Sequence, residues 1–102
     1  MNDSELLEQL RISAEKGDAI SQYGMGVVYD MGKLVTLDVE EAVRWYRMAA
    51  DQGHAEAQYS LGVRYAAGQG VSEDLTEAGK WISLAAENGS EDAIKFCQGE
   101  FL

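Results

Sequence analysis

The sequence predicts an all-α fold, an α/α solenoid of stacked antiparallel helix pairs with about six helices in total. Its 102 residues contain no proline and are rich in Ala, Leu and Glu, which favours helix over strand. Shifting the chain by 36 residues aligns the block 17–52 with the block 53–88 without a gap, at 15 identical positions. Within each block the apolar residues recur every three or four positions, the spacing of one helix face. An internal repeat of this length is typical of stacked helical arrays.

The repeat divides a single domain, residues 1–102, into four parts. Residues 1–16 are an N-terminal half repeat, residues 17–52 are repeat one, residues 53–88 are repeat two, and residues 89–102 are a C-terminal half repeat. One helix pair cannot bury its apolar face alone, so we expect the units to cover one another in series.

Sequence signals mark the helices in order. Residues 3–16 match the second helix of a unit, and residues 90–101 match the first helix. Each second helix is preceded by a capping-box pair, in which a side chain bonds the amide three residues further on. The three pairs are Asn2 with Glu5, Asp38 with Glu41, and Asp74 with Glu77. Gly17, Gly53 and Gly89 follow the last apolar positions and are expected to close these helices in the left-handed conformation.

The first helix of repeat two includes LGVRYAA and is expected to end before the turn GQGV at residues 68–71. Ala57, Leu61 and Tyr65 lie at the helical spacing i, i+4 and i+8. The glycines of LGVRYAAGQGV would also suit a phosphate-binding loop, because bare backbone amides approach anions closely. Two acidic residues follow within the next three positions and would repel phosphate, so a turn is favoured.

Gly26 and Gly62 lie in the middle of the first helices, where glycine costs up to about 1 kcal/mol relative to alanine. We therefore expect a neighbouring helix to pass close over each of them. Trp45 and Trp81 recur at one position of the repeat and are predicted to pack in the core.

Residues 57–89 fit the pattern A-x-x-x-L-G-x-x-Y-x-x-G-x-G-V-x-x-D-x-x-x-A-x-x-W-x-x-x-A-A-x-x-G at every fixed position. This stretch resembles the Sel-one-like repeat, a relative of the tetratricopeptide repeat. In repeat one, Ser21, Met25 and Leu34 replace the first alanine, the leucine and the second loop glycine. The resemblance covers nearly the whole chain. It implies a curved superhelix whose members act as adaptors, scaffolds and regulators by binding other proteins, with no general catalytic activity.

The net charge of −10 comes from 18 acidic and 8 basic residues. It argues against nucleic acid and anionic membrane surfaces as partners, because both bind basic faces, whereas a basic protein partner fits better. No apolar run approaches membrane-spanning length, and the N-terminus MNDSELLEQL is acidic where a secretory signal is basic. A cytoplasmic location is therefore expected.

Groups able to perform catalysis or to hold a metal are sparse, so the sequence predicts neither an enzyme nor a cofactor. Cys97 is the only cysteine and His54 the only histidine, so a zinc site would rest mainly on carboxylates. The serines lack a histidine partner for nucleophilic catalysis. Cys97 is interpreted as a small buried residue, and His54 as an exposed residue beside a helix start.

Partner-binding residues are expected on the first helices, which line the concave side in stacks of this kind. Residues that recur at the same position in both units are expected to pack in the core, whereas exposed residues that differ between the units are free to bind a partner. The diverging positions are Ile20, Gly24, Val28 and Met31 in repeat one, and Glu56, Ser60, Arg64 and Ala67 in repeat two. Ile20, Val28 and Met31 form an apolar hot spot if the helix phase exposes them, and core contacts if it does not. Arg64 is expected to point outward.

Two functions lead at this point, ahead of an enzyme or a small-ligand binder. The first is a protein-interaction module, or adaptor, that binds a partner protein or peptide through its concave face. The second is a small acidic inhibitor of the antitoxin or immunity type, which covers the basic active site of a toxin or enzyme. Four recurring polar or aromatic residues could add contacts, but their repetition favours a structural role: Gln22, Tyr23, Gln58 and Tyr59.

Overall fold

The computed structural model describes residues 1–99, and the fold is all-α, as predicted. Its helices are α1 (Asp3–Glu15), α2 (Ala19–Met31), α3 (Val39–Asp51), α4 (Ala55–Ala67), α5 (Leu75–Glu87) and α6 (Glu91–Cys97). Residues 1–99 contain no strand. Phe101, which lies 36 residues after Tyr65 and so shares its place in the repeat, is outside the described residues.

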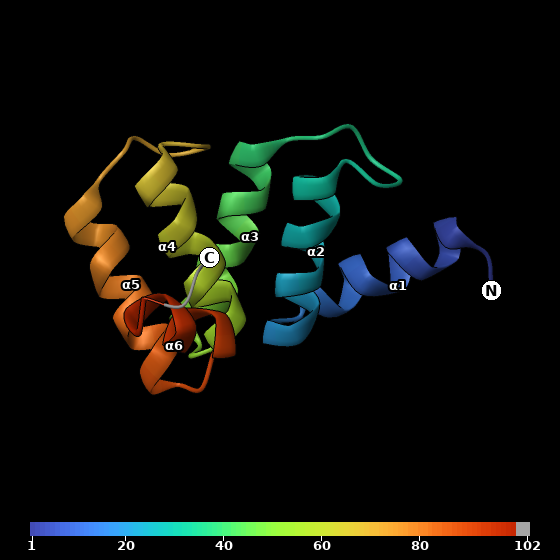
Figure 1. Ribbon diagram of the computed structural model, residues 1–102. Helices are drawn as coiled ribbons and strands as arrows, with labels where there is room; N and C mark the ends of the chain where they lie inside the picture. The colour runs from blue at the N-terminus through green and yellow to red at the C-terminus, as the bar shows by residue number, and fades with distance from the viewer. Residues whose placement is uncertain (100–102) are drawn as a thin grey trace.

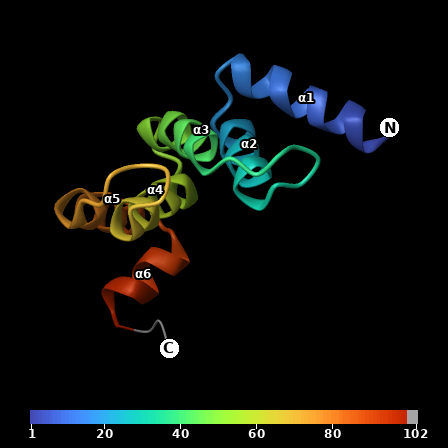
Figure 2. The ribbon, with the colours of Figure 1, turned by 90° about the horizontal axis from the view of Figure 1, so that it is seen from above.

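The helices pack as antiparallel pairs that stack into a curved, elongated molecule (Figure 1). The pairs α2–α3 and α4–α5 belong to the two whole repeats, and α1 and α6 belong to the half repeats. Each helix packs mainly against its neighbours in sequence. Figure 2 shows α2, α4 and α6 on the inner side of the curve and α1, α3 and α5 on the outer side.

The predicted caps of the second helices are present. Glu5 N donates to Asn2 Oδ1 at 2.9 Å, and the reciprocal bond completes a capping box. Asp38 and Asp74 each accept from the amide three residues further on, at 3.1 and 3.0 Å. Caps of this kind stabilise a helix by about 1 kcal/mol each. Side chains also cap the first helices, namely Asp18, His54 and Ser90.

Two glycines allow the helices of each pair to approach closely, as predicted. A Cβ atom on Gly26 of α2 would lie 2.5 Å from ring atoms of Tyr46 on α3. A Cβ atom on Gly62 of α4 would lie 2.6 Å from Cγ1 of Ile82 on α5. Both distances are far inside van der Waals contact, so a larger residue at either position requires the contacting side chain or the neighbouring helix to shift.

The core follows the stack in linked clusters. Tyr46 of α3 and Leu61 of α4, 2% and 0% exposed, lie in the central cluster. Trp45 is buried in the cluster between α1, α2 and α3, as predicted. Trp81 is only half-buried, against the edge of the central cluster, so the prediction of a core position holds for it in part.

The interpretation of Cys97 as a buried residue is wrong, because its side chain is exposed. In the repeat register Cys97 corresponds to Leu61, which is fully buried. Leu61 lies near the middle of the 13-residue helix α4, whereas Cys97 is the last residue of the seven-residue helix α6. The equivalent sequence position therefore lies at a helix end, outside the described clusters.

Candidate interaction surface

Among the diverging positions of repeat two, Arg64 and Ser60 lie against repeat one, whereas Ala67 is exposed. Arg64 Nη2 of α4 donates to Asp30 Oδ2 of α2 at 2.6 Å, and the same guanidinium bonds the Gln69 side chain. The Ser60 side chain of α4 lies beside the Tyr23 side chain of α2. The side of α4 that faces α2 therefore carries Glu56, Ser60 and Arg64. We call this contact between α2 and α4 the seam, and Arg64 is one of its structural residues.

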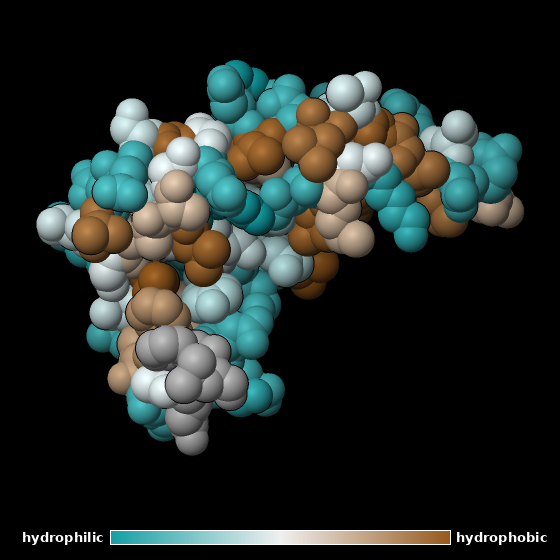
Figure 3. Space-filling view, turned by 45° about the horizontal axis from the view of Figure 1, so that its top comes forward, coloured by the Kyte–Doolittle hydropathy of each residue, from teal (hydrophilic) through white to brown (hydrophobic). Residues whose placement is uncertain are grey.

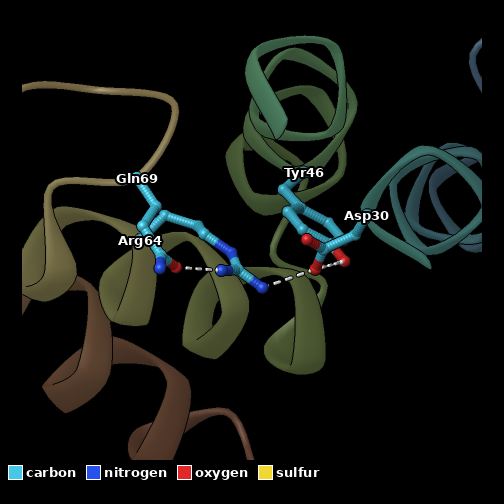
Figure 4. A network of polar contacts seen from close by, with 4 residues as sticks. All are labelled: Asp30, Tyr46, Arg64 and Gln69. Atoms are coloured by element: carbon cyan, nitrogen blue, oxygen red, sulfur yellow. Dashed lines mark hydrogen bonds and ion pairs between the residues drawn. The ribbon is translucent and has the colours of Figure 1, made fainter. Parts of the chain in front are cut away.

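The polar contacts at the seam include a network of four residues, which Figure 4 shows. Tyr46 Oη of α3 donates to the same Asp30 oxygen at 2.9 Å that accepts from Arg64. One carboxylate thus holds α2, α3 and α4 together. Burial, followed by the bond to Asp30, raises the pKa of the Tyr46 hydroxyl above its ordinary value. The side chains of Asp30 and Arg64 are 16% and 22% exposed.

The diverging positions of repeat one have a different environment. Ile20 and Met31 of α2 are 72% and 65% exposed, so the helix phase does expose an apolar pair. Val28 is half-buried, and Gly24 is covered by Leu10 of α1, which would lie 3.2 Å from a Cβ atom at that position.

Repeat symmetry shows which way this pair faces. Ile20 and Val28 occupy the positions that Glu56 and Arg64 occupy one unit later, and those two residues face the preceding first helix. The stripe of repeat one therefore lies on the side of α2 away from α4. The structure does not bring the two predicted stripes together: one is an internal seam, and the other lies at the N-terminal end of the inner face.

The recurring glutamines have structural roles. Gln22 Nε2 donates to the carbonyl of Ala14 at 3.1 Å, and Gln58 Nε2 donates to the carbonyl of Ala50 at 3.0 Å. Each bond ties the start of a first helix to the end of the helix before it. Both glutamine side chains are buried, which explains why the residue recurs in both units.

The interpretation of His54 as an exposed residue needs correction, because the side chain is half-buried. Its Nδ1 accepts from the Ala57 amide at 3.1 Å and caps α4. The imidazole ring also stacks on Tyr23, with 4.8 Å between the ring centroids. A capping histidine that joins two repeats was not foreseen, because its counterparts Asp18 and Ser90 gave no sign of an aromatic contact.

Helix α1 and the connection between α2 and α3 expose apolar residues that the sequence analysis missed. Figure 3 shows hydrophobic surface in brown toward the α1 end of the molecule. Leu6, Leu34 and Leu37 are between 53% and 57% exposed. Leu6 and Leu34 lie one repeat before Ala42 and Gly70. The signal available in the sequence was therefore a large apolar residue at a position where the next repeat has a small one.

Within residues 1–99, no group of three or more histidine, cysteine or carboxylate side chains is arranged to hold a metal ion. Among the same residues, no helix combines the length and the hydropathy needed to cross a bilayer.

The fold and the inter-repeat contacts define a helical-repeat protein of the α/α solenoid class. The model of the Sel1 repeat matches residues 19–54 and 55–90, and the chain belongs to this family. The match covers both whole helix pairs. No curated protein sequence matches the chain significantly.

Solved structures of Sel1 repeat proteins superpose closely on the chain. A Sel1 repeat protein from Oxalobacter formigenes is 40% identical, with a TM-score of 0.92, and the alignment covers 96% of this chain and 74% of that one. The cysteine rich protein B of Helicobacter pylori is 28% identical, with a TM-score of 0.88 and coverage of 94% and 72%. A protective antigen of uropathogenic Escherichia coli is 39% identical, with a TM-score of 0.80 and coverage of 91% and 21%.

Proposed function

We propose that the chain is an interaction module that docks a partner protein or peptide at the inner face of the curve, starting from the exposed side of α2. The observation that carries this proposal is the exposure of Ile20 and Met31, at 72% and 65%. Large apolar side chains with so little cover are typical of interaction sites when they lie together on one helix face.

The repeat register supports the same surface. In repeat two, the equivalent side of α4 makes the contacts to the preceding first helix, through Arg64 and Ser60. In repeat one, the equivalent side of α2 offers Ile20, Val28 and Met31 instead. A partner that packs on this side of α2 would lie as α2 itself lies against α4. Its contact with α2 would be apolar.

Paired substitutions test the proposal. A partner is captured from native lysate on the tagged protein, identified by mass spectrometry and purified, and its affinity is measured. Ile20→Glu with Met31→Glu should weaken binding by about thirtyfold or more, because two exposed apolar contacts are lost. Leu75→Glu with Leu84→Glu, on the outer helix α5, is the matched control and should leave affinity within about twofold. Equal affinity of both double variants would remove α2 from the binding surface.

A second candidate, an acidic inhibitor of a basic toxin or enzyme, has a specific observation in its favour. Among residues 1–99, only Glu8, Asp30 and Glu41 pair with an arginine, which leaves most of the acidic side chains without a basic partner. The resulting negative potential would accelerate association with a basic protein. The purified pair should then bind much more weakly at high salt, and affinity independent of ionic strength would exclude this role.

A further inference from the structure

A groove of about 460 Å³ lies on the outer part of the molecule, between α3 and the turn that follows α4. The turn presses close on α3, since a Cβ atom on Gly70 would lie 2.8 Å from the carbonyl oxygen of Val39. Val43, Met48 and Val71 supply the apolar lining. This surface is separate from the exposed stripe of α2.

Arg47 is the charged residue that makes this groove distinctive. Within residues 1–99, the other arginines each have a carboxylate within 4.0 Å, in the pairs Arg11–Glu8, Arg44–Glu41 and Arg64–Asp30. Arg47 has none, although the chain carries 18 acidic residues. Its side chain is half-buried, so the charge is partly withdrawn from water without a counterion in the described part of the chain.

Tyr65 of α4 holds Arg47 in place. One guanidinium nitrogen, Nη2, donates to the Tyr65 hydroxyl, and the guanidinium carbon lies 5.5 Å from the centroid of the ring. The remaining guanidinium donors have no hydrogen-bond partner among the described residues. An anion that binds there meets an arginine already ordered, which lowers the entropy cost of binding.

The neighbouring charges narrow the class of anion. Arg44 lines the groove but is bound to Glu41, and Glu40 is a further lining residue. Glu40 would repel a multiply charged group such as phosphate more strongly than a single carboxylate, and the carboxylate can pair with Arg47 in the bidentate geometry that guanidinium favours. The apolar lining beside it suits an aliphatic side chain next to that carboxylate.

The equivalent arginine on α1 does not form a similar site. Arg11 on α1 is the counterpart of Arg47, and Glu8 is the counterpart of Arg44. Arg11 lies 3.8 Å from Glu8, so the earlier copy neutralises its own arginine. The replacement of Glu8 by an arginine one unit later removes the internal carboxylate and leaves Arg47 open.

We propose that this groove binds an extended internal segment of a partner protein in which an Asp or Glu adjoins an aliphatic side chain. The carboxylate pairs with Arg47, and the aliphatic side chain packs on Val43, Met48 and Val71. An internal segment is favoured over a chain terminus because carboxyl termini are typically captured by nests of backbone amides, and side chains supply the charge here.

The test uses a blocked pentapeptide, acetyl-Ala-Leu-Glu-Leu-Ala-amide, titrated into the isotope-labelled protein and followed by amide chemical shifts. Saturable shifts are expected at Val43, Arg47 and Val71. The same peptide with Gln in place of Glu should bind about tenfold more weakly or worse, because it loses the charge-assisted bonds. Inorganic phosphate at equal concentration should not displace the peptide.

Matched variants separate the site from general electrostatics. Arg47→Gln should reduce peptide affinity about tenfold, whereas Lys80→Gln on α5 changes the net charge equally and should have less than a twofold effect. Val71→Asp leaves Arg47 in place but puts a carboxylate in the groove, and should also abolish binding. Amide spectra check that each variant is folded.

Three results would overturn the proposal. The first is equal affinity for the Glu and Gln peptides. The second is equal loss of affinity in Arg47→Gln and Lys80→Gln. The third is a free-acid Gln peptide that binds as tightly as the blocked Glu peptide, which would assign the groove to a chain terminus.

Discussion

At the scale of single residues, Leu34 has a backbone conformation that repeat two assigns to glycine. Its φ is 71°, against 77° for Gly70 at the equivalent position. A left-handed conformation costs a residue with a Cβ atom about 1–2 kcal/mol. The turn nevertheless keeps its form, because Asp38 N donates to Tyr29 O at 3.0 Å and Asp74 N donates to Tyr65 O at the same distance. The surrounding hydrogen bonds therefore impose the turn on Leu34.

Leu34→Gly should raise the free energy of unfolding by about 0.5–1 kcal/mol, since relief of the strained φ exceeds the entropy cost of glycine. Urea unfolding followed by circular dichroism measures the change. Gly70→Ala is the opposite substitution and should destabilise, because it adds both the strain and a Cβ atom 2.8 Å from Val39 O. A Leu34→Gly variant no more stable than the parent would show that the turn does not strain Leu34.

At the scale of helices, glycine sets the distance within each pair. Gly62 lies against Ile82 of α5, and the nearby carbonyl of Ala78 would be 3.1 Å from an added Cβ atom. The Ile82 side chain can be shortened, whereas the backbone carbonyl cannot move without shifting the helix. The closest contact that forbids a larger residue is therefore with a side chain that can be removed.

Gly62→Ala should lower the free energy of unfolding by about 1–3 kcal/mol through overpacking. Ile82→Ala alone should also destabilise, because it leaves a cavity. The double variant should be more stable than the sum of the two predicts, since the added methyl group occupies space that Ile82 vacates. Thermal unfolding of the four proteins completes the cycle. Strict additivity would mean that the two helices do not meet at this pair.

Much of the element-scale structure was predictable from the sequence, because caps, closing glycines and close-approach glycines act locally. Asp38, Asp74 and Gly26 therefore have the roles that their spacing indicated. The surroundings of the partner-binding positions were not predictable in the same way. Periodicity indicated that Arg64 does not face its paired helix. It could not indicate that Arg64 forms an ion pair with Asp30, which lies 34 residues earlier in the chain.

At the scale of the whole molecule, the Asp30–Arg64 pair joins the two repeats. Asp30→Asn or Arg64→Met should lower the free energy of unfolding by about 1–2 kcal/mol, because each leaves a partly buried group without its charged partner. The exposed pair Arg44–Glu41 is the control, and Arg44→Met should cost less than about 0.5 kcal/mol. A double-mutant cycle in urea measures the coupling of Asp30 with Arg64. Coupling no larger than that of Arg44 with Glu41 would contradict a role for the seam in holding the repeats together.

The stack has a mechanical consequence, because each helix packs mainly on its neighbours in sequence. Among residues 1–99, α1 and α5 are not one of the closely packed helix pairs. The curvature of the molecule, which is 41 Å long, is therefore set mainly by the angles between successive helices. The Asp30 carboxylate of α2 accepts hydrogen bonds from Tyr46 of α3 and Arg64 of α4, so it links three helices at the contact between the two repeats. We expect the loss of these two bonds to change the angle at this contact, and with it the span between the two ends of the molecule, with little change in either helix pair.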